Sequence, residues 1–161
     1  MNSYNVNQYR QNQISTASPE QILLMLYDGA IRFVRIAIDG IETKKPAEKC
    51  RGISKATAII TEFSNSLNHE IGGKIAEDLD ALYSFMIREL SSALLNNDTD
   101  KLRTVETLLV DLRETWEEAI ELQKKEMAAN VAAMANDKET AHEAYGAHTP
   151  VNQYQPFDTS R

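Results

Sequence analysis

The chain has 161 residues, of which 42% are hydrophobic and 25% charged, enough for one domain with its own core. Seventeen basic against 24 acidic residues give a net charge of −7. This acidic balance argues against nucleic acid as a partner, because a phosphate-binding surface requires clustered Lys and Arg.

Cysteine content and terminal patterns indicate a cytosolic protein. Cys50 is the single cysteine and cannot form an internal disulfide, as suits a reducing compartment. Residues 1–10 lack the charged and apolar regions of a signal peptide. The longest apolar run covers only residues 22–27, so we expect no membrane insertion.

The first predicted helix follows a polar arm, residues 1–17. Ser18, Pro19 and Gln21 have the spacing of a capping box with proline at the first helical position, so a helix should begin here and run to about Thr43. After Pro46, apolar residues recur at helical spacing from Ile53 to Leu67, which predicts a second helix.

The break before the third helix is marked by Asn68 and the glycine pair at 72–73. Apolar residues from Ile75 to Ala93 predict a helix that ends near Asn96. Residues 97–100 offer N-caps for a fourth helix, whose stripe from Leu102 to Ile120 includes Trp116 as an expected core residue.

No alternating strand pattern occurs in the sequence, so we expect an all-α fold. Four helices of about 20–29 residues joined by short loops predict an antiparallel up-down-up-down four-helix bundle. The expected organisation is an N-terminal arm at 1–17, the bundle at 18–128, and at 129–161 a helix extension followed by a disordered tail.

The first helix has more apolar surface than one packing face needs. Its polar residues occupy a narrow arc, and roughly three quarters of its circumference is apolar, whereas a bundle helix normally buries an arc of somewhat more than about 100°. On the wheel, Leu24 and Ile31 lie opposite the stripe centred on Ile22 and Phe33. Two interpretations remain open: the helix is the most buried element of the bundle, or its extra face lines a groove for a partner's amphipathic helix.

Enzymatic interpretations find little support. A dinuclear metal bundle needs two Glu-x-x-His motifs and two further inward Glu, and the single such spacing, Glu139 to His142, lies in the weakly patterned C-terminal region. Cys50 has no expected base beside it. We therefore expect no catalytic residue, no metal and no cofactor. Residues 70–126 contain 14 acidic and 7 basic side chains, which indicates a solvated acidic face or a docking surface.

Five sequence blocks follow one another along the chain: TASPEQILLMLYDGAIRF (16–33), ISKATAIITEFSNSL (53–67), GGKIAEDLDALYSFM (72–86), NNDTDKL (96–102) and LLVDLRETWEEA (108–119). In their order and gaps they resemble the FliS family of flagellin export chaperones, and the resemblance covers about residues 9–125.

The resemblance implies a cytosolic chaperone that binds the disordered C-terminal segment of flagellin, prevents early polymerisation and assists delivery to the flagellar type III export apparatus. It further implies a groove that draws on Leu24, Met25, Tyr27 and Ile31, and an arm, Tyr9 to Ile14, that covers part of the same surface. The export gate and flagellar regulators are open as further partners. An alternative is a helical adaptor that sequesters a flagellar regulatory protein.

Overall fold

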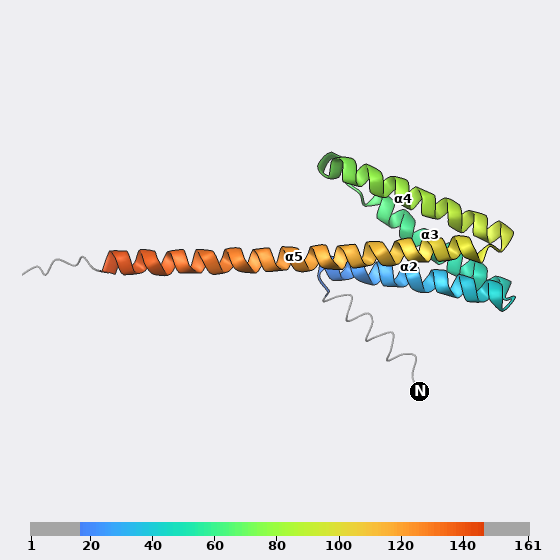
Figure 1. Ribbon diagram of the computed structural model, residues 1–161, viewed down its shortest axis with the longest axis horizontal. Helices are drawn as coiled ribbons and strands as arrows, with labels where there is room; N and C mark the ends of the chain where they lie inside the picture. The colour runs from blue at the N-terminus through green and yellow to red at the C-terminus, as the bar shows by residue number, and fades with distance from the viewer. Residues whose placement is uncertain (1–16, 147–161) are drawn as a thin grey trace, which may run out of the picture. The chain divides into compact units, whose positions relative to one another are not determined.

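The structure, a computed structural model, describes the backbone of residues 17–146 and the side chains of residues 17–134. Four helices follow one another: α2 (Pro19–Glu42), α3 (Pro46–Asn65), α4 (His69–Asn96) and α5 (Thr99–Gly146) (Figure 1). The connections are short, at 43–45, 66–68 and 97–98, so consecutive helices reverse direction. The described part of the chain contains no strand. The expected all-α bundle is confirmed.

Local capping fixes where the helices begin. The Ser18 side chain accepts a hydrogen bond from the Gln21 backbone N–H, and the Gln21 side chain accepts one from the Ser18 backbone N–H, which is the predicted capping box. Asn68 Oδ1 accepts from two backbone N–H groups at the start of α4, and Asp98 Oδ1 does the same at the start of α5. Each cap satisfies N–H groups that have no partner within the helix.

Gly73 interrupts the beginning of α4. Its φ of 47° and ψ of −127° are not helical, although helical residues lie on both sides of it. The sequence predicts a break at the glycine pair, and the structure places a first turn before it, from His69. Glycine tolerates this backbone conformation because it has no Cβ. At this kink the first turn of α4 changes direction relative to the rest of the helix.

The core lies within the compact unit that ends at Ile120. Every helix contributes fully buried apolar side chains: Tyr27 and Val34 from α2, Ile60 from α3, Met86 and Leu90 from α4, and Leu102, Val105 and Leu109 from α5. Trp116, expected in the core, is half-buried and packs against it. No side chain of a charged residue is buried in the described part of the chain.

The helices α2 and α3 approach closely at Gly52. A Cβ built on Gly52 would lie 2.6 Å from the Phe33 carbonyl oxygen and 2.7 Å from the Ala37 backbone nitrogen. These distances are well inside van der Waals contact, so only glycine permits this approach of α3 to the α2 backbone.

Three ion pairs join α2 to α5 along the outside of the bundle. The bonded atoms are 2.6–2.8 Å apart in Arg35–Glu106, Arg103–Glu42 and Arg113–Asp28. Because most of these side chains are well exposed, each pair adds little stability, of the order of 0–1 kcal/mol. The ion pair with Arg113 gives the Asp28 carboxylate a structural role in the fold.

Beyond Ile120, α5 continues as a helix to Gly146, and the chain from Glu121 onward forms a separate unit. The side chains of residues 121–134 are all exposed. At 48 residues α5 is longer than the expected 20–29. The alanines between 128 and 135 favour this extension because alanine has the highest helix propensity.

Candidate functional site: an apolar groove

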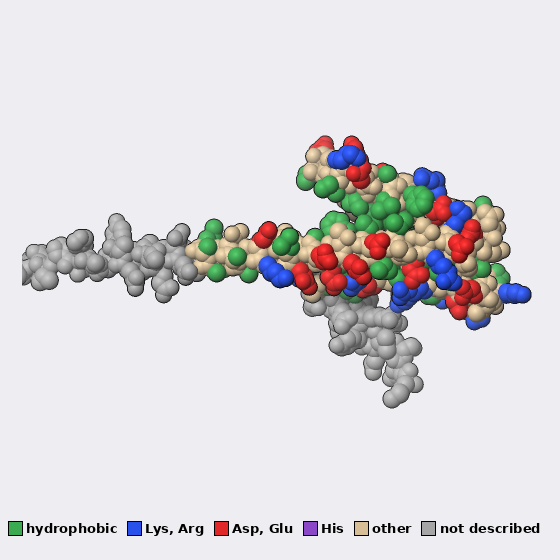
Figure 2. All heavy atoms as spheres, viewed as in Figure 1, with side chains coloured by type: hydrophobic (Ala, Val, Ile, Leu, Met, Phe, Trp, Pro, Cys, Tyr) green, Lys and Arg blue, Asp and Glu red, His purple; other side chains and the backbone are tan. Residues whose placement is uncertain are grey.

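An apolar groove of about 350 Å³ lies where the end of α3 meets the start of α4. Figure 2 shows hydrophobic side chains gathered along the edge of α4 that borders the hollow. All four helices and the loop between α3 and α4 contribute to the lining, which consists of Leu23, Phe63, Ser66, Leu67, Asn68, Ile71, Gly72, Ile75, Ala76, Leu79, Tyr83 and Trp116.

The groove has two strongly exposed isoleucines on its α4 wall. Ile71 is 86% exposed and Ile75 is 71% exposed, and they lie on either side of the Gly73 break. Fully burying an isoleucine side chain is worth about 1.5–3 kcal/mol. Covering these two residues and the apolar hollow beside them with the apolar surface of a partner would therefore lower the free energy.

Stacked aromatic rings form part of the groove and continue into the core. The rings of Tyr27 and Phe63 stack with centroids 4.4 Å apart, and Phe63 meets Tyr83 at 5.7 Å. Phe63 and Tyr83 line the groove, whereas Tyr27 is fully buried beneath. Such ring pairs add about 0.5–1.5 kcal/mol beyond their buried area, so they hold α2, α3 and α4 in register below the groove.

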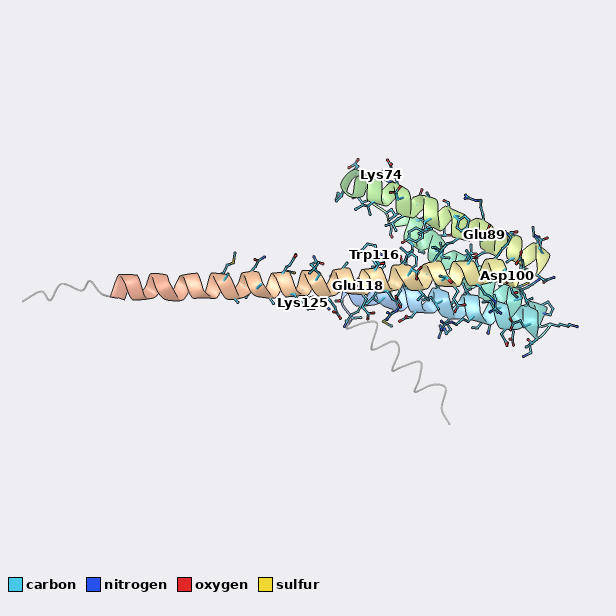
Figure 3. All side chains as sticks on the ribbon, viewed as in Figure 1. Lys74, Glu89, Asp100, Trp116, Glu118 and Lys125 are labelled. Carbon is cyan, nitrogen blue, oxygen red and sulfur yellow. The ribbon has the colours of Figure 1, made fainter. Side chains whose placement is uncertain are left out.

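A chain of hydrogen bonds connects α2, α4 and α5 below the groove. The Tyr27 and Tyr83 hydroxyl oxygens are 2.7 Å apart, and Trp116 Nε1–H donates to the Tyr27 oxygen over 3.1 Å. Trp116 projects from α5 on the side that faces α4 (Figure 3). Burial raises the pKa of both tyrosines above the ordinary value of 10.0. Both hydroxyls are therefore protonated at physiological pH.

None of the twelve lining residues is charged. The polar groups of the lining are the Tyr83 hydroxyl, the Trp116 indole N–H, and the side chains of Ser66 and Asn68. An uncharged, mostly apolar hollow with a few polar groups suits an amphipathic helix and offers no nucleophile or acid–base pair.

The sequence-predicted groove residues divide between surface and core. Met25 is 39% exposed and Leu24 is half-buried, whereas Tyr27 and Ile31 are buried in the core, Ile31 at 5% exposure. Ile31, which the helical wheel places opposite the stripe centred on Ile22 and Phe33, therefore lies in the core and not on an extra exposed face of α2. The buried face of α2 centres on Tyr27 and Val34 instead of Ile22 and Phe33, which turns Ile31 inward.

None of these four residues lines the groove that the structure shows. Their role in binding stays a prediction, and Tyr9 and Ile14 of the arm lie outside the described residues. Sequence reasoning missed Ile71, Ile75, Tyr83 and Trp116 as groove residues. One signal was present: Ile71 and Ile75 flank a glycine pair, so large apolar side chains border a backbone break.

The sites weighed for chemistry give no catalytic arrangement in the structure. Among the described residues, no group of three or more His, Cys, Asp or Glu could hold a metal ion. The Cys50 thiol is free and exposed. The side chains of Glu139 and His142 lie outside the described residues. Within residues 17–146, no helix is both long and apolar enough to cross a membrane.

The fold and the groove define a helical-bundle protein with an uncharged, mostly apolar groove on its surface. Comparison with known proteins then gives the family, because a family model described as "Flagellar protein FliS" matches residues 1–124. This chain belongs to the FliS family and is a flagellar export chaperone.

Several relatives carry the name flagellar secretion chaperone FliS. The Bacillus subtilis protein is 36% identical over 118 residues, which cover 73% of this chain and 87% of the relative. The Campylobacter jejuni protein is 35% identical, over 73% of this chain and 91% of the relative, and the Salmonella typhimurium protein 37% identical, over 67% and 81%. A solved structure titled "Crystal structure of flagellar chaperone from bacteria" matches the fold with a TM-score of 0.60 and 21% identity, over 73% of this chain and 95% of that one.

Proposed function

We propose that this chaperone binds the disordered C-terminal segment of flagellin in the bacterial cytosol. Binding prevents premature polymerisation and assists delivery of flagellin to the flagellar type III export apparatus. Family membership supports this proposal. The observation that carries it is the apolar groove with Ile71 and Ile75 exposed on its wall.

A flagellin segment that folds on the groove would cover these isoleucines with the apolar face of a helix. Ordering the segment opposes binding, since a chain that folds as it binds loses about 2–5 kcal/mol of the gross interaction energy. Affinity is thereby kept moderate, as a chaperone that must release its cargo requires.

The single tryptophan of the chain provides a direct assay. Because Trp116 lines the groove, the fluorescence of Trp116 should change when a tryptophan-free peptide of the flagellin C-terminal segment binds. Titration gives the dissociation constant. The matching N-terminal flagellin peptide serves as the ligand control and should leave the fluorescence unchanged.

Substitutions in α4 separate the groove from general surface effects. The double variant Ile71→Asp, Ile75→Asp should weaken binding at least about 30-fold, because it places two carboxylates where apolar groups should be buried. Both positions are exposed, so folding should persist. Leu95→Asp is the matched control, since Leu95 is 81% exposed on the same helix and lies outside the groove lining.

Three results decide the proposal. Loss of binding in the double variant with unchanged binding in Leu95→Asp supports it. Wild-type affinity in the double variant contradicts the groove as the binding site. Failure of the wild-type chain to bind the flagellin C-terminal peptide, or to delay flagellin polymerisation in a light-scattering assay, contradicts the proposed function as a whole.

A further inference from the structure

The start of α4 is the part of the groove wall that the core supports least. Leu67 and Leu79 pack against the hydrophobic core, whereas the described residues from 68 to 75 contribute no side chain to it. Ile71 is 86% exposed and Ile75 is 71% exposed. A segment with few buried contacts opens at a small cost in free energy, so this stretch can move while the bundle stays folded.

Residues 68–72 form one hydrogen-bonded unit. Asn68 Oδ1 accepts from the Glu70 and Ile71 backbone N–H groups over 3.1 and 3.0 Å. The Asn68 carbonyl oxygen accepts from the Gly72 N–H over 2.8 Å. These bonds cap the turn and close it on itself, so residues 68–72 should move together.

Gly73 separates this unit from the rest of α4. Its φ of 47° and ψ of −127° lie outside the helical range. A Cβ built on Gly73 would meet no atom within 4 Å, so glycine is needed here for its backbone conformation and not for lack of space. Because glycine populates positive and negative φ about equally, its torsion angles change at little cost. Lys74, labelled in Figure 3, is the first residue beyond this hinge.

We propose that residues 68–72 act as a clasp that turns about Gly73 and closes over the segment bound in the groove. Asn68, Ile71 and Gly72 line the groove, so a rotation of this unit changes the width of the groove directly. Closure brings Ile71 onto the apolar face of the bound segment. This inference rests on the proposed function and gives the binding site a moving part.

Ile71 supplies the free-energy difference between the open and the closed clasp. A ligand shifts a conformational equilibrium only through contacts that differ between the two states. A segment in the groove provides the apolar surface that the exposed Ile71 lacks in the empty chaperone, so binding favours closure. Closure then slows dissociation, because the clasp must open before the segment leaves.

Paired spin labels on α4 test the clasp by measuring one distance across Gly73. The labels are attached to Glu70→Cys and Leu95→Cys in the full chain, and Cys50, which is free and exposed, is replaced by serine. Glu70 and Leu95 are exposed and neither lines the groove, so the labels should leave the fold and the site intact. Double electron–electron resonance is recorded without peptide and with saturating flagellin C-terminal peptide. We expect the main distance to change by about 5 Å, comparable with the pitch of the single turn that moves.

Glu77→Cys with Leu95→Cys is the matched control pair. Both residues are exposed and both follow Gly73 on α4, about 27 Å apart along the helix. Peptide should leave this distance unchanged. Isothermal titration calorimetry of the same labelled chains shows whether the peptide is bound.

The outcomes separate this inference from the proposed function. A changed Glu70 to Leu95 distance with a constant Glu77 to Leu95 distance supports the clasp. Bound peptide with both distances unchanged overturns the clasp, and so does an equal change in both, which would mean that the whole helix moves. The chaperone function stands in either case. Failure of the unlabelled chain to bind the peptide overturns the proposed function and the clasp together.

Discussion

The contact of α3 with α2 at Gly52 provides a quantitative test of the packing. Gly52→Ala places a methyl group 2.6 Å from the Phe33 carbonyl oxygen, 2.7 Å from the Ala37 nitrogen and 2.9 Å from the Ala37 Cβ. Two of these three atoms belong to the backbone, so no side-chain rotation relieves the overlap. Contact at about 3.5 Å or more is needed, and the helices must separate by several tenths of an ångström to reach it.

The expected change in stability combines two opposite effects. Alanine in place of glycine in a helix favours folding by about 1 kcal/mol. Overpacking a buried contact costs about 1–3 kcal/mol, and more when the backbone itself must move. At Gly29 the new methyl group would lie 3.5 Å from Ile59 Cδ1, an ordinary contact, so Gly29→Ala keeps the favourable effect alone. The favourable effect is common to both variants and cancels in their comparison, so Gly52→Ala should be less stable than Gly29→Ala by the overpacking cost of about 1–3 kcal/mol or more.

Urea unfolding followed by far-ultraviolet circular dichroism measures this difference, provided that the m values of the variants agree. We expect Gly29→Ala to equal or exceed the wild-type stability and Gly52→Ala to fall below it. Equal stability of the two variants would refute the close approach of α2 and α3. A changed m value would mean that the comparison reports the unfolded state, and differential scanning calorimetry would then replace it.

Three further predictions address the groove, the tyrosines and the arm. Gly73→Ala forces a non-glycine residue into a backbone conformation with φ 47°, which costs about 1–3 kcal/mol or straightens the start of α4. We expect Ile71 to move and peptide binding to weaken. Unchanged affinity and unchanged stability would contradict this expectation. Because burial raises the pKa of Tyr27 and Tyr83, the unfolded chain loses these protons first as pH rises above 10.0. The free energy of unfolding should then decline by up to about 1.4 kcal/mol per pH unit for each tyrosine. The urea midpoints measured at pH 8 and at pH 11 should differ in the wild type and lie closer together in the double variant Tyr27→Phe, Tyr83→Phe. Deletion of residues 1–13 should leave the bundle cooperatively folded and bind the flagellin peptide at least as tightly, whereas much weaker binding would show that the arm holds the ligand.

The parts of the fold that depend on neighbouring residues were predictable from sequence. The capping box at Ser18 involves residues within one helical turn, so its spacing is sufficient to locate the start of α2. The apolar stripes of α3, α4 and the first part of α5 likewise follow from helical periodicity.

The direction of each face depended on contacts between helices. The α2 helix is apolar around most of its circumference, so its own sequence does not distinguish the buried face from the exposed one. Ile31, expected in the groove, lies in the core for this reason. Ile75 was an ordinary member of the predicted helical pattern and Ile71 lay in the predicted break before it, so only the packing of α4 on α3 shows that both are exposed. The close approach at Gly52 depends on the positions of both α2 and α3, so it could not be predicted from the sequence of either helix alone.

The uncharged lining of the groove has a kinetic consequence. Proteins that attract a partner through complementary charge associate up to about 10⁸–10⁹ M⁻¹s⁻¹ at low salt, and this rate falls steeply as ionic strength rises. A groove without charged lining residues provides no such local attraction. The salt dependence of segment capture should then come from charges outside the lining, on a chain whose net charge is −7. How quickly cargo is captured would depend on the cellular concentration of the chaperone.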